Sequence, residues 1–233
     1  MKHIGIVACS SEGAALCYRL ICLESQKVLG EYSHPEITMH THPFNKYVEL
    51  IRAGDWKGVA ELMLSSTKKL KLVGADFVIC PDNTIHIAFE MVERASPLPW
   101  LHIAEEVARK AKEEGYKCLG ILGTKYLMKS KVYPEKLDKF GINYLLPSDT
   151  EMDEINRIIF EELVKGIIKV ESRKLLVKTI KNLQKQGCDA VVLGCTELPL
   201  IITKDVSPLP TLDSTKILAI SALNTAISDP KNL

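Results

Sequence analysis

Two stretches of this chain align with each other without a gap, and both lead into residues suited to chemistry. Residues 74–79 read GADFVI and residues 187–192 read GCDAVV, and the same alignment places Asp82 opposite Cys195. The second stretch is an apolar run that ends in Gly-Cys-Thr-Glu. A short apolar run of this kind is typical of a buried parallel strand whose C-terminal tip is exposed. Ligands bind at such tips in open α/β sheets, so Cys195 and Asp82 are the first candidates for a functional site.

A second pair of strand-like segments repeats at nearly the same interval. Residues 3–8 read HIGIVA and residues 118–123 read CLGILG, so that Gly5 and Gly120 are 115 residues apart, whereas Asp82 and Cys195 are 113 apart. Two landmarks that recur in the same order at nearly one interval indicate an internal duplication. The sequence therefore predicts two similar α/β halves.

Between these landmarks, apolar strand-like runs alternate with helical patterns, and no hairpin signature occurs. This alternation favours parallel sheets. We predict an α/β fold of two similar domains with parallel sheets, and an active site in the cleft between them. Pro97-Leu-Pro-Trp is the expected hinge, and the terminal helix at residues 214–226 is expected to pack back on the first half. The predicted domains are residues 1–98 plus 209–233 and residues 99–208.

Composition argues against several classes of protein. The net charge of +1 gives no reason to expect a nucleic acid or an anionic membrane surface as a partner. No apolar run approaches the roughly 20 residues that a membrane-spanning helix needs. Seven cysteines without CxxC spacing favour neither a disulfide framework nor a structural zinc site. We therefore expect a cytoplasmic protein without a metal, since His40-x-His42 lacks further ligands at a suitable spacing.

The two candidate residues together suit a reaction at a carbon stereocentre. If the duplicated sheets face each other, Asp82 and Cys195 lie on opposite walls of one cleft, where one group can remove a proton and the other can return one. A thiol becomes a good base when its pKa is lowered, and a helix N-terminus directly after the strand would lower it. Small polar residues and backbone N–H groups near the tips would bind the carboxylate of the substrate. These residues are Asn83, Thr84 and Thr196, and Ser10 lies at the tip of the first strand, where a substrate could touch the loop.

Several motifs occur together in a way that resembles one known family. They are Gly194-Cys-Thr-Glu-Leu-Pro, Asn83-Thr-Ile-His, the Gly123-Thr124 turn, Tyr133 before a helix, and Glu161-Glu-Leu-Val-Lys-Gly. Over nearly the whole chain they resemble the aspartate/glutamate racemase family, whose members work without pyridoxal phosphate. The resemblance implies a homodimeric amino-acid racemase that needs no cofactor, with Cys195 as a catalytic residue and Lys165 as a substrate-binding residue. Glu197 stands where glutamate racemases usually carry His, which resembles the aspartate racemase branch.

The chain departs from the family pattern at one catalytic position. The family carries a cysteine directly before Asn-Thr, whereas this chain has Asp82 there and Cys80 two residues earlier. The period of two in a strand would point both side chains to the same side, but Pro81 disturbs the local geometry. We favour Asp82 because the internal alignment needs no gap there. A carboxylate can act as the acid or base if burial raises its pKa toward neutrality.

Other interpretations of these residues stay open at this stage. Cys195 alone could support a decarboxylase or a cis-trans isomerase of a small dicarboxylate, and the same cleft could belong to a protein that binds amino acids without turnover. Cys195 could also be a buried small hydrophobe, and Asp82 a helix cap. In a racemase, the charge of Asp82 would repel a second carboxylate and narrow the range of substrates. The expected partner in each case is a small amino acid or dicarboxylate.

Overall fold

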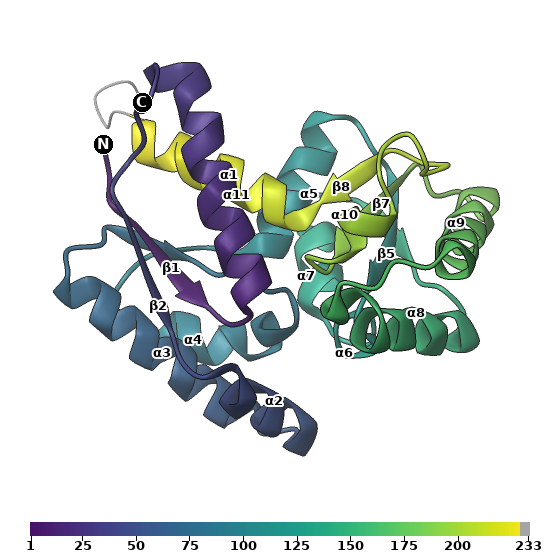
Figure 1. Ribbon diagram of the computed structural model, residues 1–233, viewed down its shortest axis with the longest axis horizontal. Helices are drawn as coiled ribbons and strands as arrows, with labels where there is room; N and C mark the ends of the chain where they lie inside the picture. The colour runs from purple at the N-terminus through teal and green to yellow at the C-terminus, as the bar shows by residue number, and fades with distance from the viewer. Residues whose placement is uncertain (229–233) are drawn as a thin grey trace. The chain divides into compact units, whose positions relative to one another are not determined.

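The computed structural model describes residues 1–228, which form two four-stranded sheets, each built only from parallel strand pairs (Figure 1). The first sheet has the strand order β2-β1-β3-β4 and the second the order β6-β5-β7-β8. The strands are β1 (Ile4–Ala8), β2 (Ile37–Thr41), β3 (Phe77–Ile79), β4 (Trp100–Leu101), β5 (Cys118–Gly123), β6 (Asn143–Leu145), β7 (Ala190–Gly194) and β8 (Thr211–Asp213). The predicted α/β class with two parallel sheets is confirmed.

The two sheets share their register as well as their strand order. Ile4 of β1 pairs with Phe77 of β3, and Leu119 of β5 pairs with Ala190 of β7. Leu119 lies 115 residues after Ile4, and Ala190 lies 113 residues after Phe77. The intervals of 115 and 113 residues that repeat in the sequence therefore relate β1 to β5 and β3 to β7.

Helices cover both faces of each sheet. They are α1 (Ser11–Leu29), α2 (Phe44–Ala53), α3 (Trp56–Leu72), α4 (Phe89–Ala95), α5 (Ile103–Glu113), α6 (Lys125–Met128), α7 (Val132–Lys139), α8 (Asp149–Glu161), α9 (Val170–Lys185), α10 (Leu198–Ile201) and α11 (Ser214–Ile227), with 3₁₀ turns η1 (Thr84–Ala88) and η2 (Leu163–Lys165). In the first sheet, α1 and α11 lie on one side of β1, and α2, α3 and α4 lie on the other (Figure 1).

The alternation of side chains along each strand explains this two-sided packing. Ile4 and Ile6 of β1 pack against α1 and α11, whereas Val7 packs against α3 on the opposite face. In the second sheet, Val191 and Leu193 of β7 pack against α8, α9 and α10. Because both faces are covered, only the ends of the strands remain open for polar groups.

The chain divides into two compact units, Met1–Glu106 together with the chain from Thr215 on, and Val107–Ser214. The first unit is discontinuous because α11 completes its core, where Leu218 and Ala222 pack with Ile4 and Cys17. The domain boundaries expected at residues 98 and 208 stay a prediction. Among residues 1–228, none of the helices has both the length and the apolar character that crossing a bilayer requires.

Two strands and one helix break were not indicated by the sequence pattern. β4 and β8 consist of two and three residues, each shortly after a Pro-Leu-Pro segment that reads as a connector. They are too short for a recognisable alternation. Residues 125–139 form two short helices, α6 and α7, with a break at Ser130, whose hydroxyl donates to Leu127 O and accepts from Val132 N–H.

The ends of the central strands β5 and β7 approach so closely that both carry glycine. Gly123 pairs with Gly194, and a Cβ atom added to Gly194 would lie 2.9 Å from the carbonyl oxygen of Leu122 and 2.7 Å from the side chain of Leu127. Backbone atoms cannot move aside without breaking the strand pairing. Gly194 is therefore required by the close approach of two backbones directly before Cys195.

We expect Gly194→Ala to lower the free energy of unfolding by about 1–3 kcal/mol, since the added methyl overpacks a backbone contact. Gly120→Ala is the matched control, because its Cβ would meet only the end of the flexible Leu183 side chain, at 2.8 Å. Urea denaturation of both variants measures the difference. Equal losses of stability would show that the backbone contact at Gly194 is not the constraint.

Candidate functional site

The second tip, which we define as the segment Cys195–Glu197 after β7, holds a thiol next to a carboxylate. Cys195 is partly exposed, and its Sγ donates a hydrogen bond of 2.9 Å to Oε2 of Glu197. The hydroxyl of Thr196 donates to the same oxygen at 2.8 Å. Glu197 itself is only 7% exposed. Two donors therefore converge on one carboxylate oxygen behind the thiol.

The helix that follows Cys195 is shorter than expected. We predicted that a helix N-terminus directly after the strand would favour the thiolate, but α10 spans only Leu198–Ile201 and begins three residues after Cys195. A helix of one turn adds little to the field at the thiol, because the macrodipole sums over aligned peptide units. The carboxylate of Glu197 is in contact with the thiol.

Buried hydrogen bonds support the strand that leads to this tip. The hydroxyl of Ser214 donates to the carbonyl oxygen of Leu193 at 3.0 Å, and Tyr133 is hydrogen-bonded to Ser214. Burial raises the pKa of the Tyr133 phenol, so it remains neutral. Thr124, at the end of the neighbouring strand, caps α6 by accepting from Leu127 N–H at 3.2 Å. These hydrogen bonds fix the ends of β7 and β5 next to the second tip.

The first tip, which we define as Cys9–Ser10 after β1 together with Asp82–Thr84 beyond β3, carries four predicted site residues. Asp82 Oδ1 accepts a hydrogen bond of 3.2 Å from Ile85 N–H, and the carbonyl oxygen of Asp82 accepts one of 2.6 Å from His86 Nδ1. The side chain of Asp82 is therefore bonded to the first turn of η1, although the N-cap residue of that turn is Asn83. Asp82 is also partly exposed, so this bond leaves the residue accessible to a substrate.

The other predicted residues of the first tip lie on the same edge of the sheet. Ser10 is the N-cap of α1 and accepts from Gly13 N–H at 3.3 Å. Asn83 is buried at the start of η1, and Thr84 is partly exposed. Because β1 and β3 pair in parallel, their carboxyl ends bring Ser10 and Asp82–Thr84 to one edge.

Cys80 is a core residue, unlike Asp82. It is fully buried in the cluster that contains Cys9 and Tyr47. Burial, followed by the charge of Asp82, raises the pKa of the Cys80 thiol well above its usual range. Burial likewise raises the pKa of Cys9, and the neighbouring Asp82 raises it further. Asp82 therefore has the exposure that an acid/base group needs, and Cys80 does not.

Lys165 reaches the carboxyl edge of the second sheet through an antiparallel pair of helices. Asn182 near the end of α9 donates to Glu151 at the start of α8, at 2.9 Å. Ser172 at the start of α9 donates to Glu162, just after the end of α8, at 2.5 Å. Because the end of α9 leads into the start of β7, the first turn of α9 lies toward the carboxyl edge of the sheet. Lys165 lies there too, in the 3₁₀ turn η2 between α8 and α9. Its side chain is exposed.

The chain matches the family model described as Asp/Glu/Hydantoin racemase over residues 6–222. The chain belongs to this family. Its members are isomerases, and the chain is therefore an isomerase of the racemase class. The predicted resemblance to aspartate/glutamate racemases is confirmed.

Individual relatives agree with this assignment. The chain is 25% identical to the broad specificity amino-acid racemase RacX of Bacillus subtilis over 206 residues, which cover 87% of this chain and 88% of RacX. The crystal structure of a candidate Asp/Glu racemase from Yersinia pestis covers 98% of this chain and all of its own, with a TM-score of 0.92 and 34% identity. The aspartate racemase homologue PH1733 from Pyrococcus horikoshii has a TM-score of 0.86 and 30% identity, covering 98% of this chain and 100% of its own.

Two residues of this racemase that lie beside the candidate acid/base groups were not among the predicted site residues. Glu197 contacts the thiol of Cys195. Cys9 lies close enough to Asp82 for the charge of Asp82 to raise the pKa of the Cys9 thiol, after burial. The only sequence signals were their positions, since Glu197 lies within the Gly-Cys-Thr-Glu motif and Cys9 lies at a strand tip beside Ser10. Cys9 is buried.

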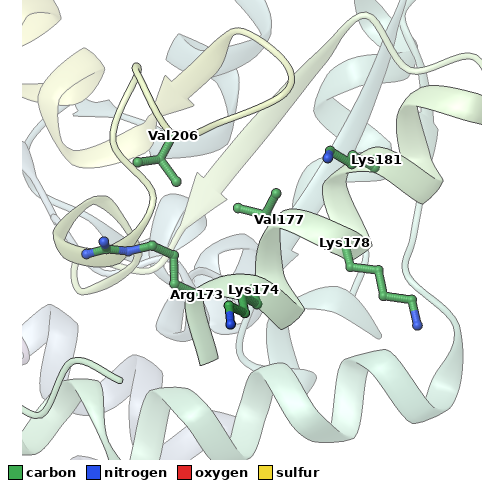
Figure 2. A pocket seen from close by; sticks show the side chains of 6 residues that line it. All are labelled: Arg173, Lys174, Val177, Lys178, Lys181 and Val206. Carbon is green, nitrogen blue, oxygen red and sulfur yellow. The ribbon is translucent and has the colours of Figure 1, made fainter. Parts of the chain in front are cut away.

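Two other features of the racemase lie apart from the predicted residues. A hollow of about 440 Å³ between α9 and the loop after α10 is lined by Arg173, Lys174, Val177, Lys178, Lys181 and Val206 (Figure 2). None of the seven predicted site residues lines it, so the strand tips define the candidate site and this hollow does not. His40 uses both ring nitrogens, with Ser66 at 2.9 Å and Lys69 at 2.8 Å.

The turn that carries Lys165 is anchored by the buried carboxylate of Glu162, which is 2% exposed. Besides Ser172, it accepts hydrogen bonds from Arg157 at 2.8 Å and Lys169 at 3.3 Å. The bond from Ser172, then that from Arg157, lowers the pKa of Glu162 to about 2. Because this value lies below that of an unfolded glutamate, about 4.3, the charged contacts stabilise the native state above that pH.

We expect Glu162→Gln to lower the free energy of unfolding by about 1–3 kcal/mol at pH 7, as charge-assisted hydrogen bonds are lost. The difference from the parent should shrink as the pH falls from about 4 to about 2, where Glu162 itself becomes protonated. Urea denaturation across this range measures both effects. Glu161→Gln is the control, because Glu161 is exposed and 3.9 Å from Arg157. A pH-independent difference would contradict this account.

Proposed function

We propose that the chain is an amino-acid racemase in which Cys195 and Asp82 are the acid/base pair. The observation that supports this most strongly is their equivalent placement. Each is a partly exposed proton-transferring side chain at the tip of the inner strand of its own sheet, and the two sheets repeat in order and register. Family membership supports the reaction, in which an α-proton is removed and returned.

The proposed reaction needs one group to be a base while the other is an acid. The base takes the α-proton of the bound amino acid, leaving a carbanion, and the acid gives a proton to the opposite side of the same carbon. The product is the mirror-image amino acid, and the two groups have exchanged protonation states. The reverse reaction restores them, so both groups must be able to gain and lose a proton near the working pH.

The remaining predicted residues would bind the substrate. Ser10, Asn83 and Thr84 on the first tip, and Thr196 on the second, offer hydroxyl and amide groups for the α-carboxylate and the α-amino group. Lys165 would bind a carboxylate as a point charge. These assignments rest on their place at the carboxyl edges of the sheets, where ligands of α/β folds bind.

The charge of Asp82 bears on the choice of substrate. A carboxylate in place of a thiol repels a second carboxylate on the substrate, which disfavours aspartate and glutamate relative to amino acids with neutral side chains. RacX, the relative from Bacillus subtilis, is described as having broad specificity. We therefore propose amino acids with neutral side chains as the preferred substrates.

The proposal also includes the oligomeric state of the protein and its location in the cell. A homodimer is what the family resemblance implies, and light scattering coupled to gel filtration would test it. A cytoplasmic location is supported by the seven cysteines, none of which forms a disulfide bond within residues 1–228. Fractionation of the native cells would test the location.

The decisive measurement is proton NMR in D2O of the purified protein with L- and D-amino acids. In the parent protein we expect the α-proton signal to disappear for both enantiomers, with formation of the mirror image. Exchange of the α-proton in one enantiomer only, without inversion, would contradict a two-sided mechanism. Absence of α-proton exchange for every amino acid of the panel would contradict the racemase proposal.

We expect Cys195→Ala and Asp82→Asn each to reduce racemisation by roughly 10²–10⁴-fold, which is the usual contribution of a general acid or base. Each variant should keep α-proton exchange for the enantiomer that the remaining group deprotonates, so the two variants should retain opposite enantiomers. Circular dichroism controls for folding, and Cys22→Ala is a matched cysteine control on the outside of α1. Loss of the same enantiomer in both variants would contradict the assignment.

A further inference from the structure

Two thiols lie in contact where the inner strands of the second sheet begin, at the opposite end of these strands from Cys195. Cys118 is the first residue of β5, and Cys188 lies two residues before β7. Their Sγ atoms are 3.8 Å apart, although the two residues are 70 positions apart in the chain. Cys118 is partly exposed, whereas Cys188 is only 4% exposed. A small reagent can therefore reach one thiol, and the other lies directly behind it.

Asp189 holds the two strand starts together. Its carboxylate accepts hydrogen bonds from the backbone N–H groups of Lys117 at 2.7 Å and Cys118 at 3.1 Å, and its own N–H donates to the carbonyl oxygen of Cys118 at 2.9 Å. Neighbouring strands lie about 4.8 Å apart, and the Cα atoms of a disulfide are usually about 4.4–6.8 Å apart. The backbones are thus spaced for a cross-link, and rotation of the side chains brings the sulfur atoms from 3.8 Å to about 2.05 Å.

The same backbone contact occurs in the first unit, with no thiol at the two corresponding positions. Asp76 accepts a hydrogen bond from the N–H of His3 at 2.7 Å and donates to its carbonyl oxygen at 2.9 Å. In the internal alignment, His3 stands opposite Cys118 and Ala75 stands opposite Cys188. The contact between the strand starts therefore does not require sulfur at either position, so the repeated fold does not explain the thiol pair.

We propose that Cys118 and Cys188 are a site of reversible oxidation, at which hydrogen peroxide converts the two thiols into a disulfide. The thiolate of Cys118 attacks one oxygen of the peroxide, and the O–O bond breaks to leave a sulfenic acid and hydroxide, which takes up the proton that the thiol had released. The sulfur of Cys188 then attacks that of Cys118, the S–O bond breaks, and the proton from Cys188 leaves with the hydroxide as water. In total the two thiols lose two electrons, and one hydrogen peroxide is reduced to two molecules of water.

The order of the two steps follows from burial. Burial, followed by the neighbouring Cys118, raises the pKa of the Cys188 thiol, and the charge of Asp189 acts in the same direction. Cys188 is therefore a poor target for a reagent from solution, and Cys118 is oxidised first. In the second step the two sulfur atoms are already in contact, so proximity compensates for the weaker nucleophile.

The disulfide joins the two central strands of the unit Val107–Ser214. It closes a loop over residues 118–188, which restricts the unfolded chain much more than the folded one. The thiol pair lies where β5 and β7 begin, whereas Cys195 follows the end of β7. Oxidation therefore stabilises the second unit and leaves the candidate site unchanged. This proposal does not depend on the proposed racemase function.

The first test is peptide mapping of the full-length parent protein by mass spectrometry. The protein is reduced, freed of reductant, treated with hydrogen peroxide, alkylated and digested without a reducing agent. We expect the peptides of Cys118 and Cys188 to be joined as the predominant disulfide, and dithiothreitol to release them. Cys22 is the internal reference, because it is also partly exposed and should form no link within the chain. Recovery of Cys188 as a free thiol, whether or not Cys118 is oxidised, would overturn the proposal.

The second test separates the two steps with serine variants. Cys188→Ser removes the second nucleophile, so peroxide should leave Cys118 as a sulfenic acid that dimedone traps. Cys118→Ser should leave Cys188 unoxidised under the same conditions, because Cys188 is buried. Circular dichroism controls for folding of both variants. If Cys188 is oxidised as fast in Cys118→Ser as in the parent, Cys118 is not the residue that meets the peroxide.

The third test follows thermal unfolding of the oxidised protein by scanning calorimetry, with and without dithiothreitol. We expect the Tm of the oxidised parent to lie at least about 5 °C above that of the reduced parent, and Cys188→Ser to show no such difference. Equal Tm values for a parent protein in which peptide mapping has confirmed the cross-link would overturn the stabilising effect.

Discussion

The parallel pairing of β1 with β3 and of β5 with β7 is the constraint on which both tips depend. In each unit the two inner strands end side by side, and helices cover both faces of the sheet. Polar groups can therefore reach solvent only where the strands stop. At the end of β7 this constraint is strict, because Gly194 meets the backbone of the neighbouring strand and leaves no room for a side chain before Cys195.

The sequence was most informative where local pattern decides structure. The apolar run into Gly194 predicts the buried strand and the exposed tip, and the internal alignment identifies Asp82 as the counterpart of Cys195. The two parallel sheets follow from the alternation of strands and helices. These features follow from the spacing of apolar and polar residues along the chain, which the sequence itself gives.

The contacts of the site join residues that are close in space, and the sequence pattern does not give these distances. Cys9 lies near Asp82 because β1 and β3 are neighbours, although the two residues are 73 positions apart in the chain. Glu197 meets Cys195 through the rotamers of a three-residue loop. Lys165 reaches the carboxyl edge because α8 and α9 are antiparallel, and consecutive helices between two parallel strands could also have packed otherwise.

The return of α11 to the first unit has a consequence for how the protein is made. The backbone N–H of Lys2 donates to the carbonyl oxygen of Ala226 at 2.8 Å, and α11 fills the core beside β1 and α1. During synthesis, all of Val107–Ser214 leaves the ribosome before α11 does. The second unit can thus finish folding while the first, although begun earlier, still exposes the apolar face that α11 will cover. The half of the protein that is translated first is the half that is completed last.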